Sequence, residues 1–280
     1  MITTEKIDIE SLVQVELPPL SNAAMRVSTL VQDMNSSTHA IAEAIGFDPG
    51  LTTRILRAAN SPLFALERSV TSLPAAVITL GNKTIHALAI VSTVSDAFGR
   101  DIGQTPAGRE LWGHLVATGL AARELSLTLG LRSSDEAFLC GLLHDIGKLL
   151  MMRHDEKLFM QVNEIRHEAQ SLESEKELFG YTHAQLGALM TKRWGLPEEI
   201  GFAIYSHHQP SEANQHVYMA RLVDVGNQLA HAATEGDLEA HEEMLSSAES
   251  VIALKFTWPQ LQEAWARAAS KMGEMMSCLK

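Results

Sequence analysis

Apolar residues recur at intervals of three and four positions along almost the whole chain, which places them on one face of an α-helix. Asp48 followed by Pro49 predicts the N-terminus of a helix over residues 51–60, because a carboxylate there accepts hydrogen bonds from unpaired amides and proline fits the first turn. Ser72 predicts the start of another helix, which ends at Gly81. No stretch keeps the alternating period of a strand, so the pattern predicts an all-α fold.

Two further helix starts bear on the chemistry of the chain. Ser133, with a glutamate three residues later, predicts a capping box for a helix that carries His144 and Asp145. Thr182, with a glutamine three residues later, predicts a second capping box that places His183 in the first turn of its helix.

Composition shifts divide the chain into segments. Gly103, Pro106 and Gly108 mark an internal boundary, and the sequence turns acidic after about residue 233. A last helix over residues 258–279 carries Trp265, Ala269, Met272 and Met276 at helical spacing, which favours a packing face. We therefore expect a frayed N-terminal lead-in (1–16), an N-terminal helical lobe (17–100), a lobe bearing the histidines (101–232) and a C-terminal helical extension (233–280).

Overall composition limits the classes of function. The 280 residues are 46% hydrophobic, which is a globular proportion, and no apolar run reaches the roughly 18 uninterrupted residues of a membrane span. Acidic residues near the N-terminus argue against a signal peptide, and Cys140 and Cys278 are too few for a disulfide framework. The net charge of −12 comes without a basic run, so we expect no nucleic-acid polymer as partner. From the apolar runs, the N-terminus and the cysteines we expect no membrane partner and a cytoplasmic location.

Histidines and acidic residues in the second half of the chain predict a metal site. Glu110 and His114 are four residues apart, on one face of a helix, while His144 and Asp145 sit in an apolar run where an ionised carboxylate needs a cation or hydrogen bonds. Imidazole and carboxylate ligands without thiolate fit iron or manganese first, with nickel, cobalt, zinc or magnesium as alternatives. The candidate ligands of two divalent ions are Glu110, His114, His144, Asp145, His183, His207, His208 and Asp224.

Each of these residues also has a structural interpretation. His144 and Asp145 together would hold two helices through a hydrogen bond, and any single histidine could be a satisfied core residue. Asp224 could cap a helix or form a buried salt bridge. Lys148 shares a face with His144 and Asp145, where it could contact a substrate phosphate or extend its ammonium group to solvent.

The motifs resemble a known family. His114, the His144–Asp145 pair and Asp224 are similar to the signature of the HD superfamily of metal-dependent phosphohydrolases. The segments 17–20, 48–52, 55–61 and 75–81 (LPPL, DPGLT, ILRAANS and AAVITLG) resemble the HDOD domain, over residues 17 to about 230. This resemblance implies a multi-helix HD-type bundle preceded by an N-terminal helical lobe, in a bacterial signalling module.

The resemblance also extends to HD-GYP domains, which cleave cyclic di-GMP. The eight candidate ligands match their metal-ligand positions in order and approximate spacing, and the run 144–148 (HDIGK) resembles their central motif, lysine included. One departure is clear. The paired histidines here are followed by residues 209–214 (QPSEAN), without the Gly-Tyr-Pro segment, which argues against cyclic di-GMP as substrate.

Two functions remain open from the sequence. The first is a metal-dependent phosphohydrolase on a nucleotide or phosphate ester, with Asp145 and Asp224 holding the metals and Lys148 steadying a phosphate oxygen. The second is a non-catalytic signalling scaffold that binds protein partners, with the metal structural or regulatory. No charged residue falls between Lys83 and Asp96, so that helix offers either a docking face or a buried core element.

Overall fold

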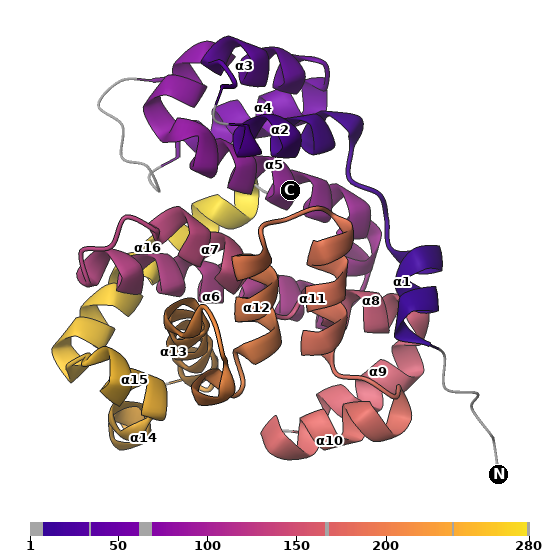
Figure 1. The fold of residues 1–280 in the computed structure, drawn as a ribbon. Helices are drawn as coiled ribbons and strands as arrows, with labels where there is room; N and C mark the ends of the chain where they lie inside the picture. The colour runs from indigo at the N-terminus through magenta and orange to yellow at the C-terminus, as the bar shows by residue number, and fades with distance from the viewer. Residues whose placement is uncertain (1–7, 34, 62–68, 166–167, 237, 279–280) are drawn as a thin grey trace.

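The computed structural model describes residues 8–33, 35–61, 69–165, 168–236 and 238–278, and within them all regular secondary structure is helical, which confirms the all-α prediction. Helices α2 to α4 and the start of α5 form a lobe at one end of the molecule, and the remaining helices form a larger body beneath it (Figure 1). In chain order the elements are α1 (Ile9–Glu16), α2 (Asn22–Gln32), α3 (Thr38–Gly46), α4 (Pro49–Ala59), α5 (Leu73–Gln104), α6 (Pro106–Thr128), α7 (Ser134–Leu143), α8 (Ile146–His154), α9 (Glu156–Asn163), α10 (Glu168–Leu178), α11 (His183–Arg193), α12 (Glu198–Ser206), η1 (Pro210–Glu212), α13 (Val217–Thr234), η2 (Glu239–His241), α14 (Glu242–Ser247), α15 (Glu249–Leu254) and α16 (Trp258–Cys278).

Most of the predicted helix starts are present. The Asp48 carboxylate accepts from the Leu51 amide at 3.0 Å and begins α4, and Thr182 forms the expected reciprocal capping box at α11. The capping box at Ser133 was wrong. Ser133 precedes α7 but its side chain accepts no capping hydrogen bond.

Helix α5 joins the two parts of the molecule. It bends at Gly81, whose φ of 80° is non-helical, where the sequence predicted an end. Its first half packs with α2, α3 and α4, while Ala87, Ile90, Val91, Val94 and Phe98 belong to the core of the larger body, so the two cores meet within one helix. Residues 84–94 are buried, which makes the uncharged stretch a core element rather than a docking face.

Helix α5 is also long and apolar enough to be compared with a membrane-spanning helix. By length and composition, α5 is the one helix among the described residues that could cross a bilayer, over Leu73–Gly99 with a mean hydropathy of 1.3. However, 61% of its apolar window is buried against the protein's own helices, as in the central helix of a packed domain.

Both ends of the chain depart from expectation. Residues 9–16 form α1, with Leu12 and Val13 buried against the larger core, whereas the sequence predicted a frayed segment; residues 1–7 lie outside the described chain. In α16 the buried face includes Ala264, Ala268 and Met275. Ala269, which was predicted to lie on the packing face, is exposed. Trp265, Met272 and Met276 are only partly buried, and residue 279 is not among those described.

Glycines let the site helices approach closely. A Cβ on Gly141 of α7 would lie 2.8 Å from the backbone oxygen of Thr118 on α6. A Cβ on Gly147 of α8 would lie 2.1 Å from the backbone oxygen of His183 at the start of α11. These contacts bring together the helices that carry the predicted ligands.

Candidate metal centre

The sequence predicted that one helix carries His144 and Asp145, and this was wrong: the two residues lie at a break between helices. Helix α7 ends at Leu143 and α8 begins at Ile146, with Asp145 as the residue that precedes it. The Asp145 side chain caps no amide of α8. The break allows neighbouring side chains to converge, since on a regular helix they would point about 100° apart.

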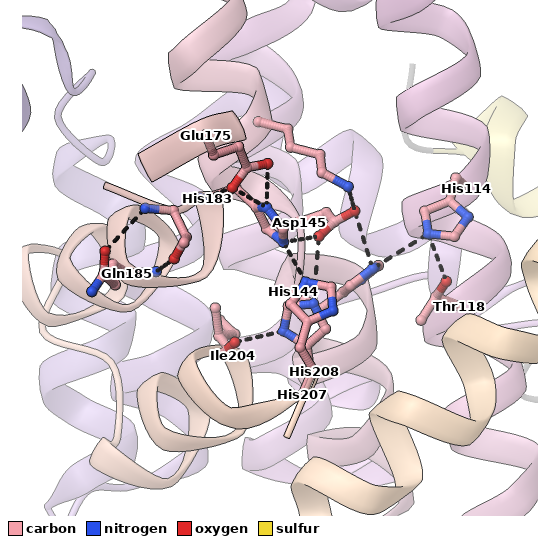
Figure 2. Close-up of polar contacts among 12 residues, drawn as sticks. His114, Thr118, His144, Asp145, Glu175, His183, Gln185, Ile204, His207 and His208 are labelled. Atoms are coloured by element: carbon pink, nitrogen blue, oxygen red, sulfur yellow. Dashed lines mark hydrogen bonds and ion pairs between the residues drawn. The ribbon is translucent and has the colours of Figure 1, made fainter. Parts of the chain in front are cut away.

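Four of the predicted ligands form one compact group, shown in Figure 2. One ligand atom from each of Asp145, His183, His207 and His208 lies within 4.8 Å of the others. Asp145 Oδ1 is 2.9 Å from His183 Nε2 and 3.6 Å from His207 Nε2, and the Nε2 atoms of His183 and His208 are 2.8 Å apart.

A second group shares the same carboxylate. His114 of α6 and His144 join Asp145 within the same 4.8 Å limit, and the Nε2 atoms of the two histidines are 3.3 Å apart. His144 Nε2 lies 3.4 Å from Asp145 Oδ2, whereas the distances to His183 and His207 involve Oδ1. Asp145 therefore stands between two clusters of imidazoles, one on each carboxylate oxygen.

Hydrogen bonds at the far side of the rings fix their orientation. The Nδ1–H of His144 donates to the Gly141 carbonyl at 2.7 Å, and that of His207 donates to the Ile204 carbonyl at 2.6 Å. His183 Nδ1 donates to the buried carboxylate of Glu175 at 2.7 Å. Each ring thus directs Nε2 at the cluster, the arrangement that positions metal-binding histidines in proteins.

The residues fit a divalent cation. Asp145 Oδ1 and His207 Nε2 are buried and have no hydrogen-bond partner. Although Asp145 Oδ1 lies close to His183, the geometry does not make a hydrogen bond. Buried polar atoms without partners are costly and rare, and here they converge with further nitrogen lone pairs on one point. Carboxylate and neutral imidazole without thiolate suit iron, manganese, cobalt, nickel or zinc.

Burial keeps three of the imidazoles neutral. Burial lowers the pKa of His144 to about 4, and it holds the pKa values of His114 and His208 well below the ordinary value. A neutral imidazole presents a lone pair, which is the form that binds a metal.

The carboxylate at the centre stays ionised. Burial alone would raise the pKa of Asp145, but the adjacent His144, Lys148 and His183 hold it well below its usual range. Burial also opposes the charged form of His183, but the carboxylates of Asp145 and Glu175 outweigh it and raise the pKa of His183 to about 9.

Lys148 contacts the centre directly. It lies in the first turn of α8, and its ammonium group donates to Asp145 Oδ2 at 2.5 Å. The side chain is 22% exposed and lines two adjoining cavities. It therefore lies between solvent-accessible space and the central carboxylate.

The two other predicted ligands lie apart from both groups. Asp224 on α13 accepts from Gln228 at 2.7 Å and from Ser250 at 2.5 Å, and burial raises its pKa. Glu110 is exposed on α6, where it lines the same cavity as His114, as their four-residue spacing predicted. The structure thus brings six of the eight candidates together, with a single carboxylate among them.

Three residues near the centre were missed by the sequence interpretation. Glu175 is surrounded by charged residues in the sequence, so nothing marked it as buried. Asn227 is buried with its Oδ1 lacking a hydrogen bond, and it lines the cavity beside His183. His231 lies one turn further along α13, with its ring 4.4 Å from that of His114. The spacing of Asn227 and His231 was the one available signal that they share a face.

An all-helical bundle with convergent His and Asp side chains defines a candidate metal-binding protein of the HD type. The HDOD domain family matches residues 17–210, and the chain belongs to this family. The matched region ends before α13, so Asn227 and His231 lie beyond it.

Several known proteins are similar to this chain. A crystal structure from Shewanella amazonensis, of a protein named "Putative phosphohydrolase", is 28% identical with a TM-score of 0.80, over 97% of this chain and 98% of that one. An uncharacterised protein of Treponema pallidum is 25% identical over 69% of this chain, and ribonuclease Y of Thermus thermophilus is 28% identical over 55%. The chain spans 38% and 21% of the lengths of these two relatives.

Proposed function

We propose that this protein is a metal-dependent phosphohydrolase that uses a binuclear centre on a nucleotide or another phosphate ester. The observation that carries the proposal is the Asp145 carboxylate, buried between two groups of imidazoles and left with an oxygen that no donor satisfies. Paired divalent ions lower the pKa of water and neutralise charge that develops on a phosphoryl group.

Different residues of the chain would hold each metal ion and bind the substrate. His183, His207 and His208 would hold one ion, His114 and His144 the other, and Asp145 would bridge the two. Lys148 reaches the central carboxylate and also faces two cavities, so its ammonium group can bind a phosphate oxygen of the substrate. Iron or manganese is the metal we expect first, because the donor set mixes imidazole and carboxylate.

The names of two similar proteins support phosphoester chemistry, one a phosphohydrolase by name and the other a ribonuclease. The net charge of −12 argues against a long polyanion, since an RNA strand needs an extended basic surface. A small phosphorylated molecule needs only local positive charge, which Lys148 and the metals supply.

The first test is elemental analysis of gently purified protein, followed by assay on p-nitrophenyl phosphate and bis(p-nitrophenyl) phosphate. We expect two metal ions per chain and metal-dependent hydrolysis. Asp145→Asn keeps the shape of the side chain but removes its charge, so it should lose both metal and activity. Asp224→Asn is the matched control, because Asp224 is bound to Ser250 and Gln228, outside both groups. Metal-free protein that takes up no metal, or Asp145→Asn with full metal content, would refute the proposal.

A non-catalytic scaffold is the second candidate, favoured by one observation. The two groups contain a single carboxylate, and the nearby α13 position is the neutral Asn227 rather than an acid. Fewer anionic ligands weaken the retention of a second ion. If metal-loaded protein is inert on both substrates while binding its metals through Asp145, the metals are structural or regulatory and the output is binding of a signalling protein.

A further inference from the structure

A cavity of about 460 Å³ opens directly beside the second ligand group. His114, Asp145 and Lys148 form one wall. The volume lies within the range of small-molecule sites in proteins, and it exceeds what a phosphate group alone would fill. The remainder of the cavity must therefore suit the organic part of a phosphate ester.

An apolar wall of the cavity comes from three helices, and the polar side chains of Arg109, Glu110 and Asn163 also line the space. Gly113 and Ala117 of α6 and Ala233 of α13 leave the space open, since their side chains are absent or small. Trp265 and Met272 of α16 line it with an indole ring and a thioether, and both side chains are only partly buried by the core. Aromatic rings and thioethers favour planar aromatic groups, through stacking and sulfur–ring contacts.

Charged contacts hold this wall in place. The buried carboxylate of Glu124 on α6 accepts from Arg267 at 2.9 Å and from Lys271 at 2.5 Å, both on α16. These two residues lie between Trp265 and Met272 along α16. The apolar wall is thus fixed against the same helix that carries His114.

From this juxtaposition we infer that the cavity binds the planar base of a nucleotide, with the base against Trp265 and Met272 and the phosphate at Lys148. The inference rests on the proposed function, because the phosphate must meet the metal centre. It assigns base selectivity to α16, a helix beyond the matched family region of residues 17–210. An aliphatic phosphate ester would leave the aromatic wall without a stacking partner.

The test compares two ligands that carry the same phosphomonoester, adenosine 5′-monophosphate and ribose 5-phosphate. Their affinities for metal-loaded protein are measured by calorimetry, alongside hydrolysis. Gly113→Leu places an apolar side chain at the cavity, and no atom lies within 4 Å of a Cβ there. Gly99→Leu is the matched control, a helical glycine of α5 whose Cβ also meets open space. Trp265→Leu provides a second variant, which removes the ring and keeps an apolar side chain.

We expect wild type and Gly99→Leu to bind the nucleotide roughly tenfold or more tightly than the sugar phosphate, as stacking of one base on an aromatic side chain provides. Gly113→Leu and Trp265→Leu should abolish this preference and leave sugar-phosphate affinity unchanged. Equal affinities in the wild type, or a preference that survives both variants, would overturn the base site while the proposed function stands. If metal-loaded protein neither binds nor hydrolyses either compound, the base site and the phosphohydrolase proposal both fail.

Discussion

Replacement of Gly147 by alanine tests whether close helix packing assembles the metal centre. A Cβ at this position would lie 2.1 Å from the backbone oxygen of His183 and 3.0 Å from the backbone nitrogen of Gly187. Backbone atoms cannot rotate away as a side chain can. Helices α8 and α11 must therefore separate by roughly 1 Å, because real Cβ contacts are essentially never shorter than 3.0 Å.

The size of the effect follows from two opposing contributions. Overpacking of a close interior contact costs about 1–3 kcal/mol. Alanine is the better helix former by about 1 kcal/mol, which offsets part of that cost. We expect Gly147→Ala to destabilise the protein by about 1–2 kcal/mol in urea unfolding and to lower metal content, since Lys148 and His183 move apart.

Gly273→Ala is the matched control in α16. No atom lies within 4 Å of a Cβ at Gly273, so the same substitution should leave stability unchanged or raise it by up to about 1 kcal/mol. The packing argument is refuted if Gly147→Ala unfolds at the wild-type urea concentration and retains the full metal content.

Three further predictions concern single side chains. Burial lowers the pKa of His86 to about 4, so on acidification the unfolded chain binds a proton at a higher pH than the folded protein does. The free energy of unfolding should therefore fall by up to about 3 kcal/mol between pH 6.5 and 4, and urea unfolding of His86→Gln should show a shallower pH dependence. Asn60 makes three hydrogen bonds to backbone atoms, so we expect Asn60→Ala to cost roughly 2 kcal/mol in unfolding, against no change for the exposed Asn82→Ala. Glu175→Gln removes the charge that orients His183, so metal titration should show about 10–100-fold weaker binding; unchanged affinity would exclude this role.

Helical periodicity and local caps were readable from the sequence because both depend on neighbouring residues. The all-α class and the helix starts at Asp48, Ser72 and Thr182 were predicted correctly for this reason. The buried face of α16 differs from the predicted packing face, since Ala269 is exposed while Ala268 is buried. Small alanines carry little periodic signal, and the burial of a given face depends on which helix covers it.

The sequence by itself determined which residue types are available for a metal centre and the helical framework that carries them. Only the tertiary structure decided which of them meet: it places a helix break at Asp145, directs Asp224 toward Ser250, and brings the unpredicted Glu175 against His183. The physical reason is the difference in range between the two kinds of interaction. A cap or a helix face is set by residues three or four apart, whereas a ligand cluster requires chain segments tens of residues apart to pack at one distance and one angle.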